Sequence, residues 1–216
     1  MRGGKRAVTD VLMLLEHDGR RPLIAADAYI APTAVLCGDV TIAAGCRVLF
    51  GAVLTAEDGP VMVGEGCVVM EHAVVRGRSA HPARLGARVL VGPHAHVNGA
   101  DVEDEAFIAT GAALFPGARI GARAEIRING VVHVNSTLPD EAVVPIGWVA
   151  VGDPARILPP SAHDEIWEIQ QELGFVRTVA GVHDHQRDAS GSAMPALMRT
   201  YGDLYGRHRD DRPLEP

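Results

Sequence analysis

Histidines supply the clearest candidates for chemistry in this sequence. Four of them, His72, His81, His94 and His96, lie in one stretch of the chain. His94 and His96 are two residues apart, so on an extended segment their side chains point the same way. Imidazole is a common metal ligand, so a metal site built from this pair with His72 or His81 is one hypothesis. The alternative is that all four are surface or interface histidines near turns.

The three cysteines add nothing to that hypothesis. Cys37, Cys46 and Cys67 form no CxxC pair and have no histidines at metal-ligand spacing beside them. We interpret them as reduced, buried side chains, which is typical of a cytoplasmic protein. The apolar run near the N-terminus is interrupted by Asp10 and Glu16, so we expect no signal peptide.

The elements that must position these residues follow from a repeat of six. Branched aliphatic residues recur at this spacing in four sets: Ile42, Val48 and Leu54; Val63, Val69 and Val75; Leu85, Val91 and Val97; and Val102, Ile108, Leu114, Ile120 and Ile126. Small residues often follow four positions later, as at Cys46, Ala52, Cys67, Ala73, Ala95, Ala106, Ala112, Ala118 and Ala124. A helix repeats about every 3.6 residues and a strand about every 2, so this period predicts short strands joined by tight turns. We therefore expect an all-β solenoid over residues 1–160.

The repeat is interrupted over residues 55–62 and 77–84, which we expect to protrude as loops, and its spacing drops to five between Val97 and Val102. Beyond Pro160 the pattern becomes helical. We expect a helix within residues 161–180 that packs on the solenoid, with Ser161 as its cap and Gly174 at its end. Residues 181–216 are polar, so we expect a flexible tail or a strip that binds a partner.

Composition and charge exclude two classes of partner. The formal net charge is −7 and no block of Lys or Arg is present, so we expect no nucleic acid partner. No stretch approaches the roughly 20 apolar residues of a membrane-spanning helix, so we expect no membrane partner. Aromatic residues are only 4% of the chain, and the interior must therefore be built from aliphatic side chains.

Several segments resemble the γ-class carbonic anhydrase-like family of hexapeptide-repeat proteins. They are residues 34–40 (AVLCGDV), 63–67 (VGEGC), 109–112 (ATGA) and 147–155 (GWVAVGDPA). The resemblance implies a left-handed parallel β-helix of triangular section with a C-terminal α-helix, assembled as a homotrimer. Active members of the family hold a zinc or iron ion between subunits with three histidines and hydrate carbon dioxide. A metal ion with such ligands lowers the pKa of its bound water to about 7.

The matching positions in this chain do not carry those ligands. Arg76, Pro93 and Asn98 stand where the resemblance places the three histidines. A guanidinium has no lone pair for a metal, proline has no side-chain donor, and an amide oxygen suits harder ions. We therefore expect no zinc-dependent hydration of carbon dioxide. We also expect no resident cofactor, unless the four histidines named above rebuild a zinc or iron site.

Two interpretations of the replaced positions remain open. In the first, Arg76 and Asn98 bind a carboxylate, bicarbonate or phosphate-bearing small molecule between subunits, with His94 or His96 titrating beside them. The further candidates for binding or catalysis there are Thr55, Glu57, Glu71 and His81. Either glutamate would hold the guanidinium or act as a general base. In the second interpretation, Arg76 and one glutamate form a salt bridge that only stabilises the trimer.

Two other function classes also fit the repeat. Hexapeptide-repeat acyltransferases use a histidine as general base, a role open to His81 or His133. The candidates for binding the phosphates of coenzyme A are sparse: Arg76, Arg78, Arg84 and Arg88. A non-catalytic assembly module would instead use residues 181–216 to bind its partners.

Overall fold

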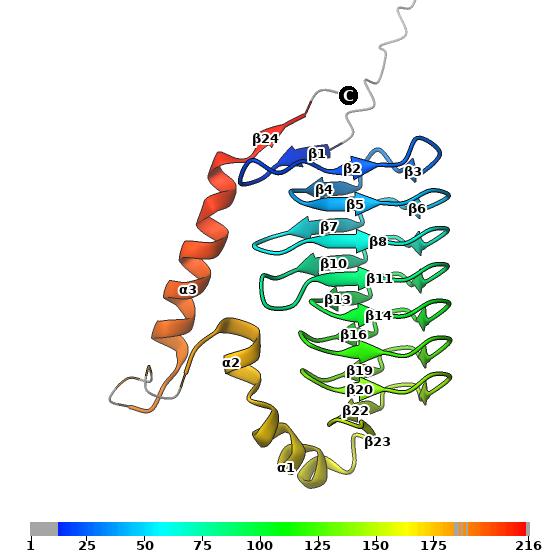
Figure 1. Ribbon diagram of the computed structural model, residues 1–216. Coiled ribbons are helices and arrows are strands. Elements are labelled where there is room, and N and C mark those ends of the chain that lie inside the picture. Colours follow the sequence, from blue (N-terminus) through cyan, green and yellow to red (C-terminus); the bar gives the residue numbers. More distant parts are fainter. Residues whose placement is uncertain (1–12, 184–185, 187, 189, 215–216) are drawn as a thin grey trace, which may run out of the picture.

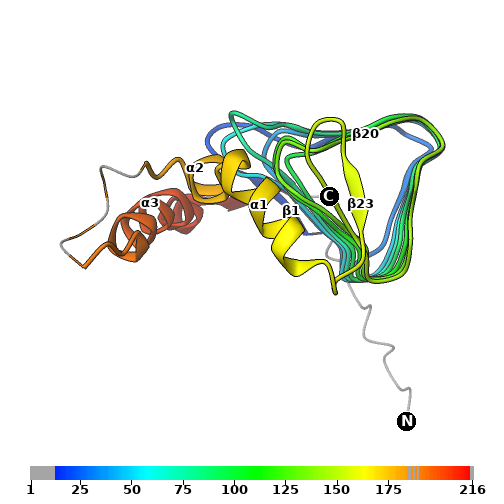
Figure 2. The same ribbon diagram turned by 90° about the horizontal axis from the view of Figure 1, so that it is seen from below.

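The structure is a computed structural model that describes residues 13–183, 186, 188 and 190–214. Its main part is a left-handed parallel β-helix, in which each turn of the chain contributes a short strand to each of three faces. Figure 1 shows the turns stacked on one another, and Figure 2, which looks along the stack, shows their triangular outline. The all-β solenoid predicted from the repeat of six is confirmed for the described residues, and residues 1–12 of the predicted range 1–160 lie outside them.

Three sheets form the faces of the β-helix. We call the ten-stranded sheet the covered sheet, because helices lie against it (Figure 2). Its strands are β1 (Met13–Glu16), β4 (Val35–Cys37), β7 (Val53–Ala56), β10 (Val74–Gly77), β13 (His96–Asn98), β16 (Ala113–Leu114), β19 (Val131–Val132), β22 (Val149–Val151), β23 (Arg156–Leu158) and β24 (Arg212–Pro213). The second sheet contains β2 (Leu23–Ile24), β5 (Val40–Ile42), β8 (Val61–Val63), β11 (Ala83–Leu85), β14 (Asp101–Val102), β17 (Arg119–Ile120) and β20 (Thr137–Leu138). The third contains β3 (Tyr29–Ile30), β6 (Arg47–Val48), β9 (Val68–Val69), β12 (Leu90–Val91), β15 (Phe107–Ile108), β18 (Glu125–Ile126) and β21 (Val143–Val144).

The interior is a continuous stack of aliphatic side chains. Every branched residue of the four predicted sets is at most 4% exposed, and the small residues four positions later are buried as well. Leu54, Val75 and Val97, for example, pair in register on three successive strands. Fully burying one such side chain stabilises the fold by about 1.5 to 3 kcal/mol, and each turn is completed by the turns above and below it.

The two interruptions of the repeat form loops, as predicted, but shorter ones. They occupy residues 57–60 between β7 and β8 and residues 78–82 between β10 and β11. Figure 1 shows the second loop protruding from the stack. Thr55 and Ala56 still belong to β7, so the first interruption begins later than the spacing suggested. Asp58 links the loops, because its carboxylate accepts hydrogen bonds from the backbone N–H and the hydroxyl of Ser79.

Two helices follow the last turn, α1 (His163–Leu173) and α2 (Phe175–Ala180). Gly174 ends α1, as predicted, and adopts a left-handed conformation with φ of +63°. The predicted Ser161 cap is wrong, because the N-cap residue is Ala162 and it makes no side-chain capping bond. Asp164 and Glu165 occupy the first turn instead, where negative charge is favourable.

Residues 181–216 contain more regular structure than their composition predicted. They include α3 (Met194–Gly206), a 3-10 helix η2 (Arg207–Asp210) and β24, which pairs antiparallel with β1. Figure 1 shows α3 running back along the β-helix toward its first turn. The physical reason is a modest apolar face on α3, from which Ala196 and Leu204 are buried. In the described part of the chain, no helix is long and apolar enough to cross a membrane.

Candidate functional site

Strand register places three of the predicted site residues in one row on the covered sheet. Arg76 on β10 pairs with Thr55 on β7 at one side and with Asn98 on β13 at the other. The residue before each of them is buried in the core, so these three side chains lie on the outer face of the sheet. Thr55 and Asn98 are nevertheless only 6% exposed. The structure thus brings together residues that the sequence separates by a whole turn.

Glu57 joins this row from the loop after β7. Its carboxylate, 4% exposed, accepts a hydrogen bond of 3.1 Å from the Thr55 hydroxyl and lies 3.5 Å from Arg76 Nε. On the other side, Arg76 Cζ lies 5.7 Å from the centre of the Tyr205 ring on α3, within cation–π range. Arg76 therefore lies between an anion and an aromatic ring of its own chain, and 28% of its side chain stays exposed.

The same row contains buried polar atoms that lack hydrogen-bond partners. His96 lies on β13 two residues before Asn98, so both side chains lie on the same face. Arg76 Nε, His96 Nε2 and Asn98 Oδ1 make no hydrogen bond to any residue that the structure describes. Burial lowers the pKa of His96 and the charge of Arg76 lowers it further, which favours a neutral imidazole. We call Thr55, Glu57, Arg76, His96 and Asn98 the Arg76 group.

The other predicted site residues lie elsewhere. His94 occupies a corner with φ of +57°, and its ring stacks on that of His72 with centroids 5.2 Å apart. The expectation that His94 and His96 point the same way is therefore wrong, because the chain turns between them. Glu71 lies beside this corner, where its carbonyl accepts a hydrogen bond from the His94 N–H. His81 lies on the loop between β10 and β11, where burial lowers its pKa. The four histidines do not converge on one point.

The positions of the family's metal ligands do not fit a metal ion here. Arg76 and Asn98 are neighbours on the covered sheet, whereas Pro93 lies at the corner that carries His94. Arg76 is a cation already paired with Glu57. No imidazole stands at any of the three positions, so this donor set cannot reproduce the three-histidine site that the resemblance implies.

Two further residues, Tyr205 and His208, lie beside the Arg76 group and were not predicted from the sequence. His208 Nε2 lies 2.8 Å from Glu57 Oε2, and its Nδ1 lies 2.8 Å from Asp211 Oδ2. Burial lowers the pKa of His208, but the hydrogen bonds to Asp211 and Glu57 outweigh it, so the net shift is upward. Both residues come from the C-terminal segment, and no repeat spacing relates that segment to the β-helix.

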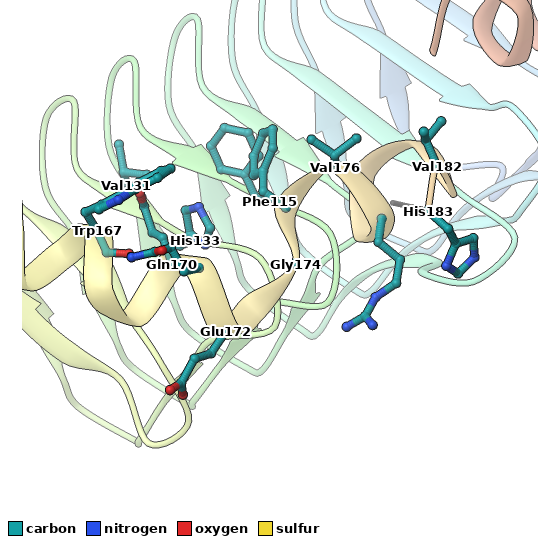
Figure 3. A pocket seen from close by; sticks show the side chains of 13 residues that line it. Phe115, Val131, His133, Trp167, Gln170, Glu172, Gly174, Val176, Val182 and His183 are labelled. Atoms are coloured by element: carbon teal, nitrogen blue, oxygen red, sulfur yellow. The ribbon is translucent and has the colours of Figure 1, made fainter. Parts of the chain in front are cut away.

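A separate cavity lies between the helices and the covered sheet. Its volume is about 780 Å³, and Figure 3 shows Phe115, His133 and Trp167 among the side chains that line it. His133 is 6% exposed, and its Nδ1 has no hydrogen-bond partner within the described part of the chain. Burial lowers the pKa of this imidazole, and the Phe175 ring lies 5.5 Å from it. A neutral imidazole of this kind can accept a proton.

Comparisons with known proteins agree with the resemblance. No family model matches the chain. Gamma carbonic anhydrase 1, mitochondrial, of Arabidopsis thaliana is 30% identical over 170 residues, which cover 76% of this chain and 60% of that protein. Gamma carbonic anhydrase 2, mitochondrial, of the same plant is 28% identical over 198 residues, which cover 89% of this chain and 69% of that protein. The chain thus spans less than two thirds of the first of these relatives.

A solved structure shares the fold. It is that of a candidate acetyltransferase of Bacillus cereus, with a TM-score of 0.50 at 22% identity, and the match covers 74% of this chain and 92% of that one. At this level of identity the likeness concerns the fold alone. It supports the β-helix fold.

Proposed function

This chain is a divergent γ-carbonic-anhydrase-like protein, and we propose that its Arg76 group binds a small carboxylate or bicarbonate anion at the interface of a homotrimer. The observation that carries the proposal is a set of buried atoms without a hydrogen bond, Arg76 Nε, His96 Nε2 and Asn98 Oδ1, of which Arg76 Nε has only a 3.5 Å ion-pair contact with Glu57. Each buried polar atom without a partner costs about 1 to 3 kcal/mol, so a ligand that pairs with these atoms gains that amount. A carboxylate supplies acceptors for the guanidinium, and bicarbonate also carries an O–H that can donate to the amide oxygen.

Glu57 does not use up the binding capacity of Arg76. Its contact with Arg76 Nε is 3.5 Å long, whereas a charge-assisted hydrogen bond between such groups is about 2.7 to 2.9 Å. The other oxygen of Glu57 lies closer to His208, at 2.8 Å. The guanidinium is therefore oriented by Glu57 and by Tyr205 while some of its N–H donors remain available to a ligand.

The proposed interface uses a row of exposed apolar side chains along the corner between the third sheet and the covered sheet. Phe50, Ile128 and Ile146 are 51%, 45% and 63% exposed on this corner. Ile128 and Ile146 lie on successive turns, whereas Glu71, Pro93 and Thr110 lie between Phe50 and Ile128. Pro93 lies in the same row and, with Phe107, lines an apolar cavity of about 480 Å³. Exposed apolar patches of this kind mark interaction surfaces. A second copy of the chain is the occupant we propose, with this row packed beside the neighbour's Arg76 group.

Thermal unfolding of the full chain tests the anion site. We expect bicarbonate, acetate or phosphate, at constant ionic strength, to raise the Tm of the parent protein saturably, by about 3 to 6 °C at ten times the Kd. Arg76→Met removes the cation and should abolish that rise. The matched control is Arg84→Met, which changes an arginine that is 48% exposed on the second sheet and should keep the rise. If the parent does not respond to any of the three anions, or if Arg76→Met responds equally, the proposal is wrong.

A second candidate function rests on the cavity of Figure 3. A volume of about 780 Å³ is within the range of small-molecule sites, and His133 is a buried neutral base in its wall. This favours the acyltransferase alternative, with His133 rather than His81 as general base. Coenzyme A should then raise the Tm saturably, and a His133→Gln variant should respond less. If coenzyme A does not change the Tm of the parent protein, this alternative is wrong.

A further inference from the structure

Four side chains of metal-binding type converge where the C-terminal segment meets the first turn of the β-helix. His17 follows β1, Cys37 ends β4, His208 belongs to η2 and Asp211 follows η2. One ligand-type atom from each of them lies within 4.8 Å of the others. His17 and Cys37 are only 2% and 3% exposed. Over the described ranges, this is the one group of three or more His, Cys, Asp or Glu side chains gathered so closely.

Asp211 lies at the centre of the group. Its Oδ1 is 2.5 Å from His17 Nδ1, and its Oδ2 is 2.8 Å from His208 Nδ1 and 3.4 Å from Cys37 Sγ. The two imidazole rings stack with centroids 4.4 Å apart. Two nitrogens, a sulfur and a carboxylate from three distant parts of the sequence therefore face one point.

Hydrogen bonding at His208 leaves room for a cation at that point. A neutral imidazole has a single N–H, and Nε2 lies 2.8 Å from the buried carboxylate of Glu57, which can only accept. With the proton on Nε2, the lone pair of Nδ1 faces the carboxylate of Asp211. Two lone pairs in contact repel each other unless a cation lies between them. A second proton on the ring, hydrogen-bonded to Asp211, also relieves this contact, and a metal ion bound here would replace that proton.

His17 and Cys37 complete the group around Asp211. His17 Nε2 is buried and has no hydrogen-bond partner among the described residues. The Cys37 thiol donates a hydrogen bond to Asp211 Oδ2, so its sulfur also faces the carboxylate. One metal ion beside Asp211 would accept the Nδ1 lone pairs of both rings and would stabilise a Cys37 thiolate next to the carboxylate.

We propose that His17, Cys37, His208 and Asp211 bind one zinc ion. Two neutral imidazoles, a thiolate and a carboxylate balance the charge of Zn²⁺, and four protein ligands are typical of closed, structural zinc sites. Glu57 supports the site, since metal-bound histidines usually donate their second N–H to a carboxylate or carbonyl. The ion fixes η2 and β24 on the first turn of the β-helix.

The zinc site shares no residue with the positions of the family's metal ligands. Glu57 contacts both His208 and Arg76, so the site is a neighbour of the Arg76 group. The two proposals remain separable, because Arg76 offers no ligand to a metal. An Arg76→Met variant should lose anion binding and keep its zinc.

Metal analysis of the full chain tests this proposal. The protein is freed of metal with a chelator, incubated with Zn²⁺, and passed through a desalting column in metal-free buffer. Mass spectrometry should then find about one zinc ion per chain. Cobalt in place of zinc should give the near-ultraviolet absorption band of a cobalt–thiolate bond. Cys37→Ser should abolish this band and weaken metal binding by at least about 10-fold, the smallest effect usual even for outer residues.

The matched control is Cys67→Ser, which changes another buried cysteine outside the group and should retain both the metal and the band. His208→Gln changes a ligand whose side chain is 31% exposed, so it serves if Cys37→Ser does not fold, and it should also lose the metal. A parent chain that retains no Zn²⁺, or a cobalt band that survives both Cys37→Ser and His208→Gln, would overturn the proposal.

Discussion

His133 is a buried imidazole whose pKa is lowered because its surroundings favour the neutral form. The unfolded chain therefore takes up a proton before the folded chain does as the pH falls below about 6.5. The stability that this residue contributes is fully present above that pH and is lost as the pH falls through the lowered pKa. We expect His133→Gln to reduce the slope of the unfolding free energy against pH by up to about 1.4 kcal/mol per unit between pH 6.5 and 5. Urea unfolding at a series of pH values measures this slope.

His163 provides the comparison, because its side chain is 81% exposed. His163→Gln should leave the slope as it is in the parent. If His133→Gln also left it unchanged, the neutral, buried imidazole would not be the source of acid sensitivity, and its role as a base in the cavity would lose support.

Single residues of the site were predictable from the sequence only where the repeat or the family resemblance fixed their place. Arg76 and Asn98 were placed in one site by the family resemblance, and the structure pairs them in register on neighbouring strands. His94 was misplaced, because a period of six does not say where the backbone leaves the strand for a corner. His208 could not be found at all, since its contact with Glu57 joins residues 151 positions apart without any periodic signal.

At the scale of elements, the turns of the β-helix were predictable because each turn requires the same residue types at equivalent positions. Leu54, Val75 and Val97 occupy equivalent places in the interior, so the same residue type recurs at a fixed interval. The loops at residues 57–60 and 78–82 were visible as breaks in that interval. The start of the first loop could not be predicted, because β7 continues for two residues beyond the buried Leu54.

The C-terminal elements have no such repeated residue pattern. The first residues of α3 include Pro195, and most of its side chains are partly exposed, so its apolar pattern is weak. The strand β24 is two residues long and pairs with β1, which lies almost two hundred residues earlier in the chain. A local sequence pattern cannot predict such a distant pairing. The role of residues 181–216 in binding a partner protein stays a prediction.

At the scale of the whole molecule, the β-helix presents its faces unequally. The covered sheet is overlaid by α1, α2 and α3 (Figure 2). Phe50, Ile128 and Ile146, at the corner between the third sheet and the covered sheet, are exposed in the single chain. A homotrimer would bury this apolar row and would place it beside a neighbouring Arg76 group. Closed rotational symmetry requires one kind of contact repeated three times, so a single substitution in the row acts on every interface at once.

Ile146→Asp is therefore expected to dissociate the proposed trimer. In the isolated chain Ile146 is 63% exposed, so the substitution should change the stability of the fold by no more than about 0.5 kcal/mol. In the trimer it would bury an unpaired carboxylate at each interface and weaken self-association by at least about 10-fold. Sedimentation equilibrium should find close to three times the chain mass of 22.8 kDa for the parent and a lower mass for the variant. Leu23→Asp, at an equally open position on the second sheet, should keep the parent's mass, and equal behaviour of the two variants would contradict this interface.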